Sequence, residues 1–105
     1  MVRAAQHLDI PNGVLAVILN VPDSVVLQLQ ANAEILPPDS KPYVRGQLLI
    51  QLFHHLNAIN NGVDEASRHW LNSHCLELDA RPINVIRTGQ GLMKAVSYLG
   101  TRQKR

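Results

Sequence analysis

The chain has 105 residues, which suits one compact core or two very small packed units and excludes two independent domains. Hydrophobic residues make up 46%, charged residues 17% and the net charge is +2, a balance that excludes an intrinsically disordered chain. Without a long apolar run or a recognisable signal peptide, and with Cys75 as the only cysteine, we expect a cytoplasmic protein with no membrane span and no internal disulfide.

Residues 2–36 are predicted to form three short helices. Residues 2–8 form the first, and Pro11 stands where a first helical turn tolerates proline. Residues 14, 15, 18 and 19 are apolar and share one face of the second helix. The third follows Pro22, where Asp23 and Ser24 are expected to cap it, and it continues to about residue 33.

The clearest amphipathic pattern lies in a long helix predicted over residues 42–60. Its apolar side chains recur on one face, and Ser40 is placed to cap its first turn. A further helix is expected over residues 64–71. Residues 72–80 are expected to be mostly loop.

The segment RPINVIRTGQGL, residues 81–92, is predicted to be an elbow between two helices. Pro82 opens a short helix, Thr88 caps the last one, and the glycines allow close approach of the backbone. The segment lacks the signatures of a dinucleotide-binding loop and of a P-loop, so phosphate binding is not expected. Arg81, Arg87 and Gln90 remain exposed around an apolar elbow, which suits a protein-binding surface.

Charge is unevenly distributed along the chain. Residues 81–105 hold six basic residues and no acidic one, whereas residues 1–80 hold four basic and eight acidic residues. This asymmetry points to an acidic partner of the C-terminal quarter, with a solvated helix end as the alternative.

A short helix, a tight turn and a second short helix over residues 14–30 have the plan of a helix-turn-helix. Such a motif places its second helix in the major groove of DNA, where Ser24, Gln28, Gln30 and Asn32 could reach base edges. The predicted helix from residue 23 holds no Lys or Arg, however, and phosphate neutralisation supplies most DNA affinity. We therefore expect weak DNA binding by the protein alone, with a purely structural motif as the alternative.

Neither a metal site nor a catalytic site is expected. His54 and His55 are adjacent and point about 100° apart on a helix. His69, His74 and Cys75 have no zinc-binding spacing. Cys75 is not marked by a matching base, so the sequence does not predict an enzyme.

The segment HWLNSHCLELDARPINVIRTGQGLMKAVSYL, residues 69–99, resembles the toxin-binding domain of the Xre/MbcA/ParS antitoxin family. The segment HLDIPNGVLAVILNVPDSVV is similar to the Xre-like helix-turn-helix of that family, and PPDSKPYVRGQLLIQLFHHL to its linking helix. The family often has Gly where Asp9 and Asn20 stand, and Ser or Thr where Pro11 and Pro22 stand. The resemblance thus covers nearly the whole chain.

The resemblance implies an all-α fold. A helix-turn-helix bundle with its linking helix, residues 1–60, would be joined to a small helical toxin-binding domain, residues 61–105. It also implies a homodimeric antitoxin that inhibits a RES-domain toxin, a class that degrades NAD or transfers ADP-ribose, without a cofactor or chemistry of its own. The alternative is a stand-alone helix-turn-helix transcription regulator.

Candidate site residues follow from this resemblance. The expected toxin-binding residues are Trp70, Leu76, Arg81, Pro82, Ile83, Ile86, Arg87, Gln90, Lys94, Arg102 and Arg105. For Trp70, Ile83 and Ile86 the alternative is a place in the core. Antitoxins of this family often repress their own operon. If this protein does so, the expected DNA contacts are Ser24, Gln28, Lys41 and Arg45.

Overall fold

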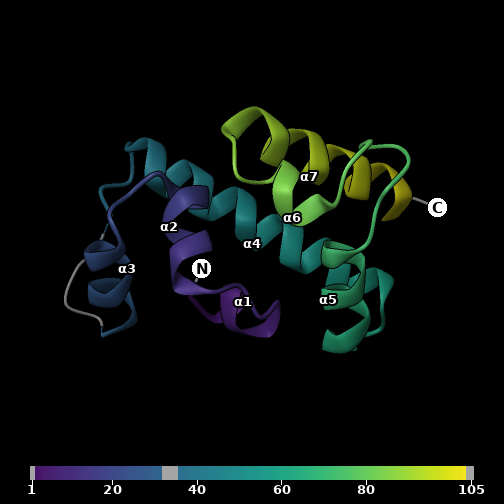
Figure 1. Ribbon diagram of the computed structural model, residues 1–105, viewed down its shortest axis with the longest axis horizontal. Coiled ribbons are helices and arrows are strands. Elements are labelled where there is room, and N and C mark those ends of the chain that lie inside the picture. The colour runs from purple at the N-terminus through teal and green to yellow at the C-terminus, as the bar shows by residue number, and fades with distance from the viewer. Residues whose placement is uncertain (1, 32–35, 104–105) are drawn as a thin grey trace.

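The computed structural model describes residues 2–31 and 36–103, and these form helices connected by turns and loops (Figure 1). In chain order the helices are α1 (Val2–His7), α2 (Asn12–Leu19), α3 (Asp23–Gln30), α4 (Lys41–Ile59), α5 (Asp64–Asn72), α6 (Pro82–Val85) and α7 (Gly89–Gln103). Within the described residues the only β-type pairing is an isolated bridge between Cys75 and Ala80. The expectation of an all-α fold is confirmed.

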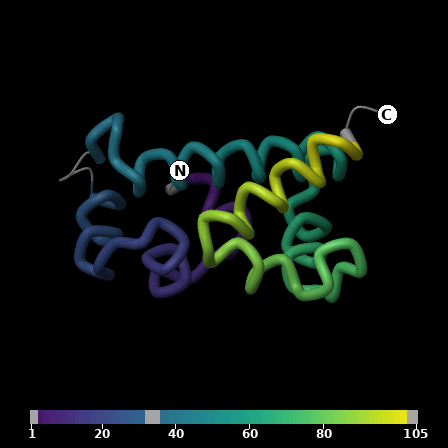
Figure 2. Tube along the Cα trace, turned by 90° about the horizontal axis from the view of Figure 1, so that it is seen from above, coloured from purple at the N-terminus to yellow at the C-terminus, as the bar shows by residue number. Residues whose placement is uncertain are grey.

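Helix α4 organises the molecule. It runs along one side, with α1, α2, α5 and α7 packed against it (Figures 1 and 2). Its most extensive partner is α7. Leu49, Leu52 and Leu56 of α4 are buried in one continuous core that extends from Ala5 to Leu99. The core therefore crosses residue 60, the predicted boundary between the two units.

Helices α2 and α3 have the geometry expected of a helix-turn-helix. The bend between them is 106°, within the range of about 90–120° typical of this motif. Asn20 ends α2 in the left-handed conformation, with φ of 60°, and Pro22 precedes α3. The apolar pattern holds: Leu15, Ile18 and Leu19 are buried, as are Val26 and Leu29 of α3.

Two of the predicted helix caps are confirmed and one is wrong. Ser40 accepts a hydrogen bond from the backbone N–H of Tyr43 at 3.2 Å, and Thr88 accepts one from Gly91 at 3.0 Å. Asp23 and Ser24 do not cap α3, because the preceding Pro22 is extended, at φ −64° and ψ 153°, and occupies the cap position. They form the first helical turn instead, where the Asp23 charge favours the helix dipole.

The elbow at Thr88 depends on Gly91. A Cβ atom at Gly91 would lie 1.9 Å from the Val85 carbonyl oxygen and 2.9 Å from the Thr88 hydroxyl oxygen. No side chain fits at that separation, so α7 can begin this close to α6 only with glycine. The prediction that glycine allows close approach of the backbone at this elbow is confirmed at Gly91.

Candidate functional site

Leu76 is presented at the tip of a closed turn between α5 and α6. The Cys75 N–H donates to the Ala80 carbonyl at 3.0 Å and the Ala80 N–H returns a bond of 3.4 Å. Cys75 and Leu78 are buried beneath this turn, and Asp79 adopts a φ of 55° to close it. Leu76 is left 84% exposed. The segment was expected to be mostly loop, and it is a loop held closed by paired backbone bonds.

Trp70, Leu76 and Arg102 line one surface depression of about 280 Å³, together with Tyr98 of α7. A second depression of about 430 Å³ shares Tyr98 and Arg102 with it. The Arg102 guanidinium donates a hydrogen bond to the Tyr98 hydroxyl at 3.1 Å and lies 5.8 Å from the centre of its ring. The structure thus brings three of the expected toxin-binding residues together and adds Tyr98, which sequence reasoning missed.

Glu77 gives this surface a local negative charge. Its pKa lies below the ordinary value, chiefly because a backbone N–H hydrogen bond favours the carboxylate, with further contributions from the Cys75 thiol and the Arg102 charge. The Cys75 sulfur lies 3.5 Å from the carboxylate. Cys75 is therefore part of the scaffold that holds Leu76, a role that the sequence did not indicate.

The elbow residues divide between surface and core. Pro82 and Ile86 are buried, and Ile83 is half-buried against the same core. Arg81 is exposed at the start of α6. Pro82 and Ile86 therefore lie beneath the surface and expose almost no area to a partner. For Ile86 this is the alternative given above, a place in the core.

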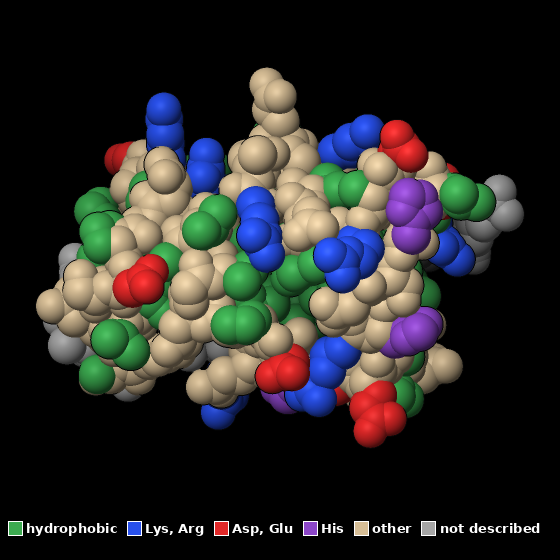
Figure 3. Space-filling view, in the orientation of Figure 1, with side chains coloured by type: hydrophobic (Ala, Val, Ile, Leu, Met, Phe, Trp, Pro, Cys, Tyr) green, Lys and Arg blue, Asp and Glu red, His purple; other side chains and the backbone are tan. Residues whose placement is uncertain are grey.

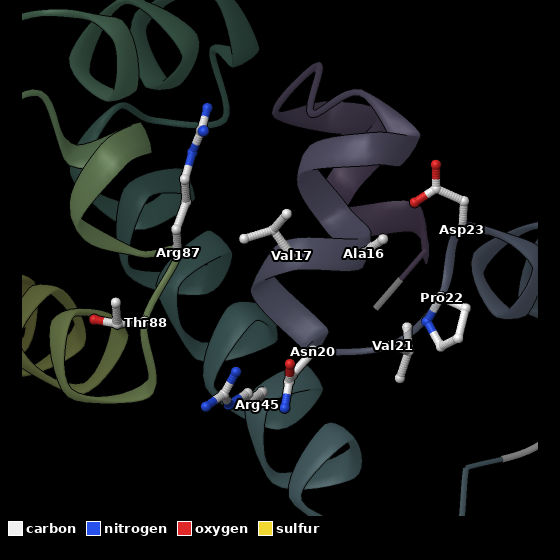
Figure 4. A pocket seen from close by; sticks show the side chains of 9 residues that line it. All are labelled: Ala16, Val17, Asn20, Val21, Pro22, Asp23, Arg45, Arg87 and Thr88. Carbon is white, nitrogen blue, oxygen red and sulfur yellow. The ribbon is translucent and has the colours of Figure 1, made fainter.

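Arg87 lies apart from the Leu76 surface, in a depression of about 590 Å³ beside the α2–α3 turn (Figure 4). Arg45 of α4 and Asn20, the C-cap residue of α2, line the same depression, and Val17 is 49% exposed within it. Figure 3 shows hydrophobic side chains exposed near the middle of the same face, with Lys or Arg side chains beside them. Arg87, expected at the toxin, therefore lines the same depression as Arg45, expected at DNA.

Gln90 lies in a neighbouring depression of about 520 Å³ between α4 and α7. Lys41 and Arg45 line the α4 side of this depression. The depression therefore also combines a residue expected to bind the toxin, Gln90, with two residues expected to bind DNA. Lys94 is exposed further along α7, and Arg105 lies outside the described residues. The expected toxin-binding residues are consequently spread over several parts of the surface.

The exposed side of α3 carries two of the expected DNA contacts. Ser24 and Gln28 are exposed and one helical turn apart, so they share a face. Gln30 is instead hydrogen-bonded to Asn12 of α2 at 2.6 Å, and Asn32 lies outside the described residues. Lys41 and Arg45 are on α4 and not on this face.

Val44 and Met93 are further residues that sequence reasoning missed. They are 52% and 58% exposed and line the depression between α4 and α7. Val44 precedes Leu48 by one helical turn, so the apolar pattern of α4 could have revealed it. Met93 gave no comparable signal.

Among the described residues there is no group of three or more His, Cys, Asp or Glu side chains that could hold a metal ion. No single helix in this part of the chain is long and apolar enough to cross a membrane. Helices α2 and α3 reach the required length and apolarity only when taken together, across their 106° bend.

No model of a protein family matches the chain, and no curated protein matches it.

Proposed function

We propose that the protein is an antitoxin of a type II toxin–antitoxin pair, which binds a RES-domain toxin in the cytoplasm and blocks access to its substrate site. The sequence resemblance over residues 69–99 supports this proposal, and the all-α fold with a helix-turn-helix is compatible with it. Inhibition requires occupancy of a surface and no chemistry by the antitoxin.

The observation that carries the proposal is the exposure of Leu76. An 84% exposed leucine on a closed turn is a rigid apolar anchor, and burying it in a partner would contribute about 1.5–3 kcal/mol. Trp70, Tyr98 and Arg102 stand around it. Trp, Tyr and Arg are the residue types enriched where binding energy concentrates in interfaces.

The positive charge of the C-terminal quarter also supports binding of a partner at the surface around Leu76. Residues 81–105 carry six basic residues and no acidic one. Arg102 is exposed at the Leu76 surface. An acidic rim around the toxin cleft would attract this end of the chain and speed association.

Co-expression with the RES-domain toxin that the proposal expects in the same operon is the test. The wild-type protein should restore growth, and Leu76→Asp should fail to do so. Leu27→Asp is the matched control, because Leu27 is also an exposed leucine, at 55%, but lies on α3. Growth arrest that persists with soluble wild-type protein would contradict the proposal, as would equal effects of the two substitutions.

The alternative function is a stand-alone transcription regulator, which the 106° bend and the exposed Ser24 and Gln28 favour. Helix α3 contains no Lys or Arg, so we expect the free protein to bind its own promoter weakly. A mobility-shift titration measures this. Nanomolar binding at physiological salt, weakened by Gln28→Ala, would favour the regulator.

A further inference from the structure

The closed turn that presents Leu76 also presents two carboxylates. Cys75 and Leu78 are buried beneath the turn, whereas Leu76, Glu77 and Asp79 are exposed. The N–H groups of Leu78 and Asp79 donate to the carbonyls of Cys75 and Leu76, each at 3.2 Å, and hold the backbone in this shape. The exposed tip is therefore one large apolar side chain with acidic side chains next to it.

The Glu77 carboxylate has a fixed place beside Leu76. The Cys75 thiol donates a hydrogen bond to it, with 3.5 Å between sulfur and oxygen. A carboxylate has about four acceptor sites, so this bond leaves most of its capacity to water. Because Leu76 and Glu77 are adjacent on a closed turn, a partner pocket that takes in Leu76 also removes water from the Glu77 carboxylate.

The described part of the chain provides no ion-pair partner for Glu77. Arg102 lines the depression of about 430 Å³ together with Glu77, Tyr98 and Thr101. Its guanidinium donates to the Tyr98 hydroxyl at 3.1 Å. Among the described residues neither Glu77 nor Arg102 takes part in an ion pair. Both charges on this surface thus depend on water in the protein alone.

Loss of this water has an energetic consequence. A charged group is costly to remove from water unless an opposite charge and hydrogen bonds replace it. When Leu76 is buried by a partner, the partner must therefore supply a donor for Glu77 and an acceptor for Arg102. The two requirements have opposite signs of charge.

We propose that the toxin pocket that receives Leu76 has a rim of both charges, with a Lys or Arg side chain that pairs with Glu77 and a carboxylate that faces Arg102. This inference rests on the proposed antitoxin function and specifies the partner surface of that same site. It makes Glu77 a determinant of which toxin is bound. It also fixes the orientation of the toxin, whose basic edge lies at the turn and whose acidic edge lies at α7.

A uniformly acidic rim is the alternative. It would suit residues 81–105, which carry six basic residues and no acidic one. It would, however, set like charges against Glu77 and Asp79, and like charges opposed across an interface cost several kcal/mol of affinity. The two alternatives predict opposite effects of a positive charge at residue 77.

Calorimetric titration of the full chain with the RES-domain toxin that the proposal expects in the same operon tests the inference. Glu77→Gln keeps the length of the side chain and removes its charge, so it should weaken binding by about tenfold or more. Glu77→Lys should weaken binding further, because it would face the basic group of the toxin. Arg102→Gln should also weaken binding.

Glu65→Gln and Glu65→Lys are the matched controls. Glu65 is exposed on α5 and lines neither depression of the Leu76 surface, so these variants change the net charge equally at another place. They should alter the affinity by about twofold or less. Circular dichroism should show the same helix content in all five variants, which separates weaker binding from unfolding.

The outcomes separate this inference from the proposed function. Suppose that the wild type binds the toxin and Leu76→Asp does not, while Glu77→Lys binds as tightly as the wild type or more tightly. The inference would then be overturned and the proposed function would stand. Equal losses for Glu77→Lys and Glu65→Lys would overturn it as well, because the effect would then come from net charge. A wild-type protein that does not bind the toxin would contradict both.

Discussion

The imidazole Nδ1 of His7 lies 2.8 Å from a carboxylate oxygen of Asp64 and so joins the end of α1 to the start of α5. The His7 ring also stacks on Phe53 of α4, with ring centres 5.1 Å apart. Arg68 of α5 donates a hydrogen bond from its Nε to the His7 carbonyl at 2.8 Å. One residue of the first helix therefore contacts both α4 and α5.

Removal of the Asp64 charge should have a small effect. The two side chains are 49% and 33% exposed, so Asp64→Asn should lower the free energy of unfolding by about 0.2–1 kcal/mol. Urea denaturation measures this. Glu65→Gln, at the neighbouring exposed position, is the control and should change stability less.

Two glycine substitutions should have opposite effects. Gly91→Ala should destabilise the protein by about 2 kcal/mol or more, because the new Cβ would overlap the Val85 carbonyl. Gly13→Ala should stabilise it by about 0.5–1 kcal/mol, because nothing lies within 4 Å of a Cβ there and Gly13 is within α2. Thermal denaturation of both variants checks the sign, and a Gly91→Ala protein as stable as wild type would contradict the proposed close approach.

Local features of this fold could be predicted from the sequence, because they depend on neighbours along the chain. Ser40 and Thr88 cap helices from a few residues away, and the stripe of Leu49, Leu52 and Leu56 follows helical spacing. The surface depressions could not be predicted. They join residues such as Arg45 and Arg87, whose proximity depends on how α4 and the elbow pack in three dimensions.

Asn20 should tolerate glycine better than alanine. Its φ of 60° is left-handed, a conformation that costs a residue with a Cβ about 1–2 kcal/mol but costs glycine little. Asp9, with φ of 56°, is in the same situation. Asn20→Ala should lower the melting temperature. Asn20→Gly, which also removes the amide, should lower it less or raise it.

The Glu77 carboxyl should titrate below its ordinary pKa of 4.5. Because the pKa is lowered in the folded state, the associated stability is present above the ordinary value and is lost as the pH falls through the folded value. An NMR titration of the carboxyl carbon measures the midpoint. Cys75→Ala removes one of the hydrogen bonds and should move the midpoint upward, whereas Arg3→Gln, on α1, should leave it in place.

If the protein is the proposed antitoxin, deletion of residues 101–105 should weaken toxin binding and leave the core folded. Leu99, the last buried apolar residue of α7, is retained, and so is Gly100, which packs against His55. The deletion removes Arg102 and two further basic residues, so association with the toxin should slow and depend less on salt. Association rates at two ionic strengths measure this. Equal rates for the truncated and full chains would show that these residues are only a solvated helix end.

Helix α4 packs against helices from both ends of the chain, so the two ends of the protein should unfold together. Leu49, Leu52 and Leu56 belong to one core with α2 and α7, so a proteolytic cut within this helix would expose apolar faces of both groups at once. Neither the α2–α3 motif nor the Leu76 turn would survive as a stable fragment. Degradation of the chain would therefore abolish the binding surfaces at both ends in a single event. No fragment that keeps one of these surfaces would persist in the cell.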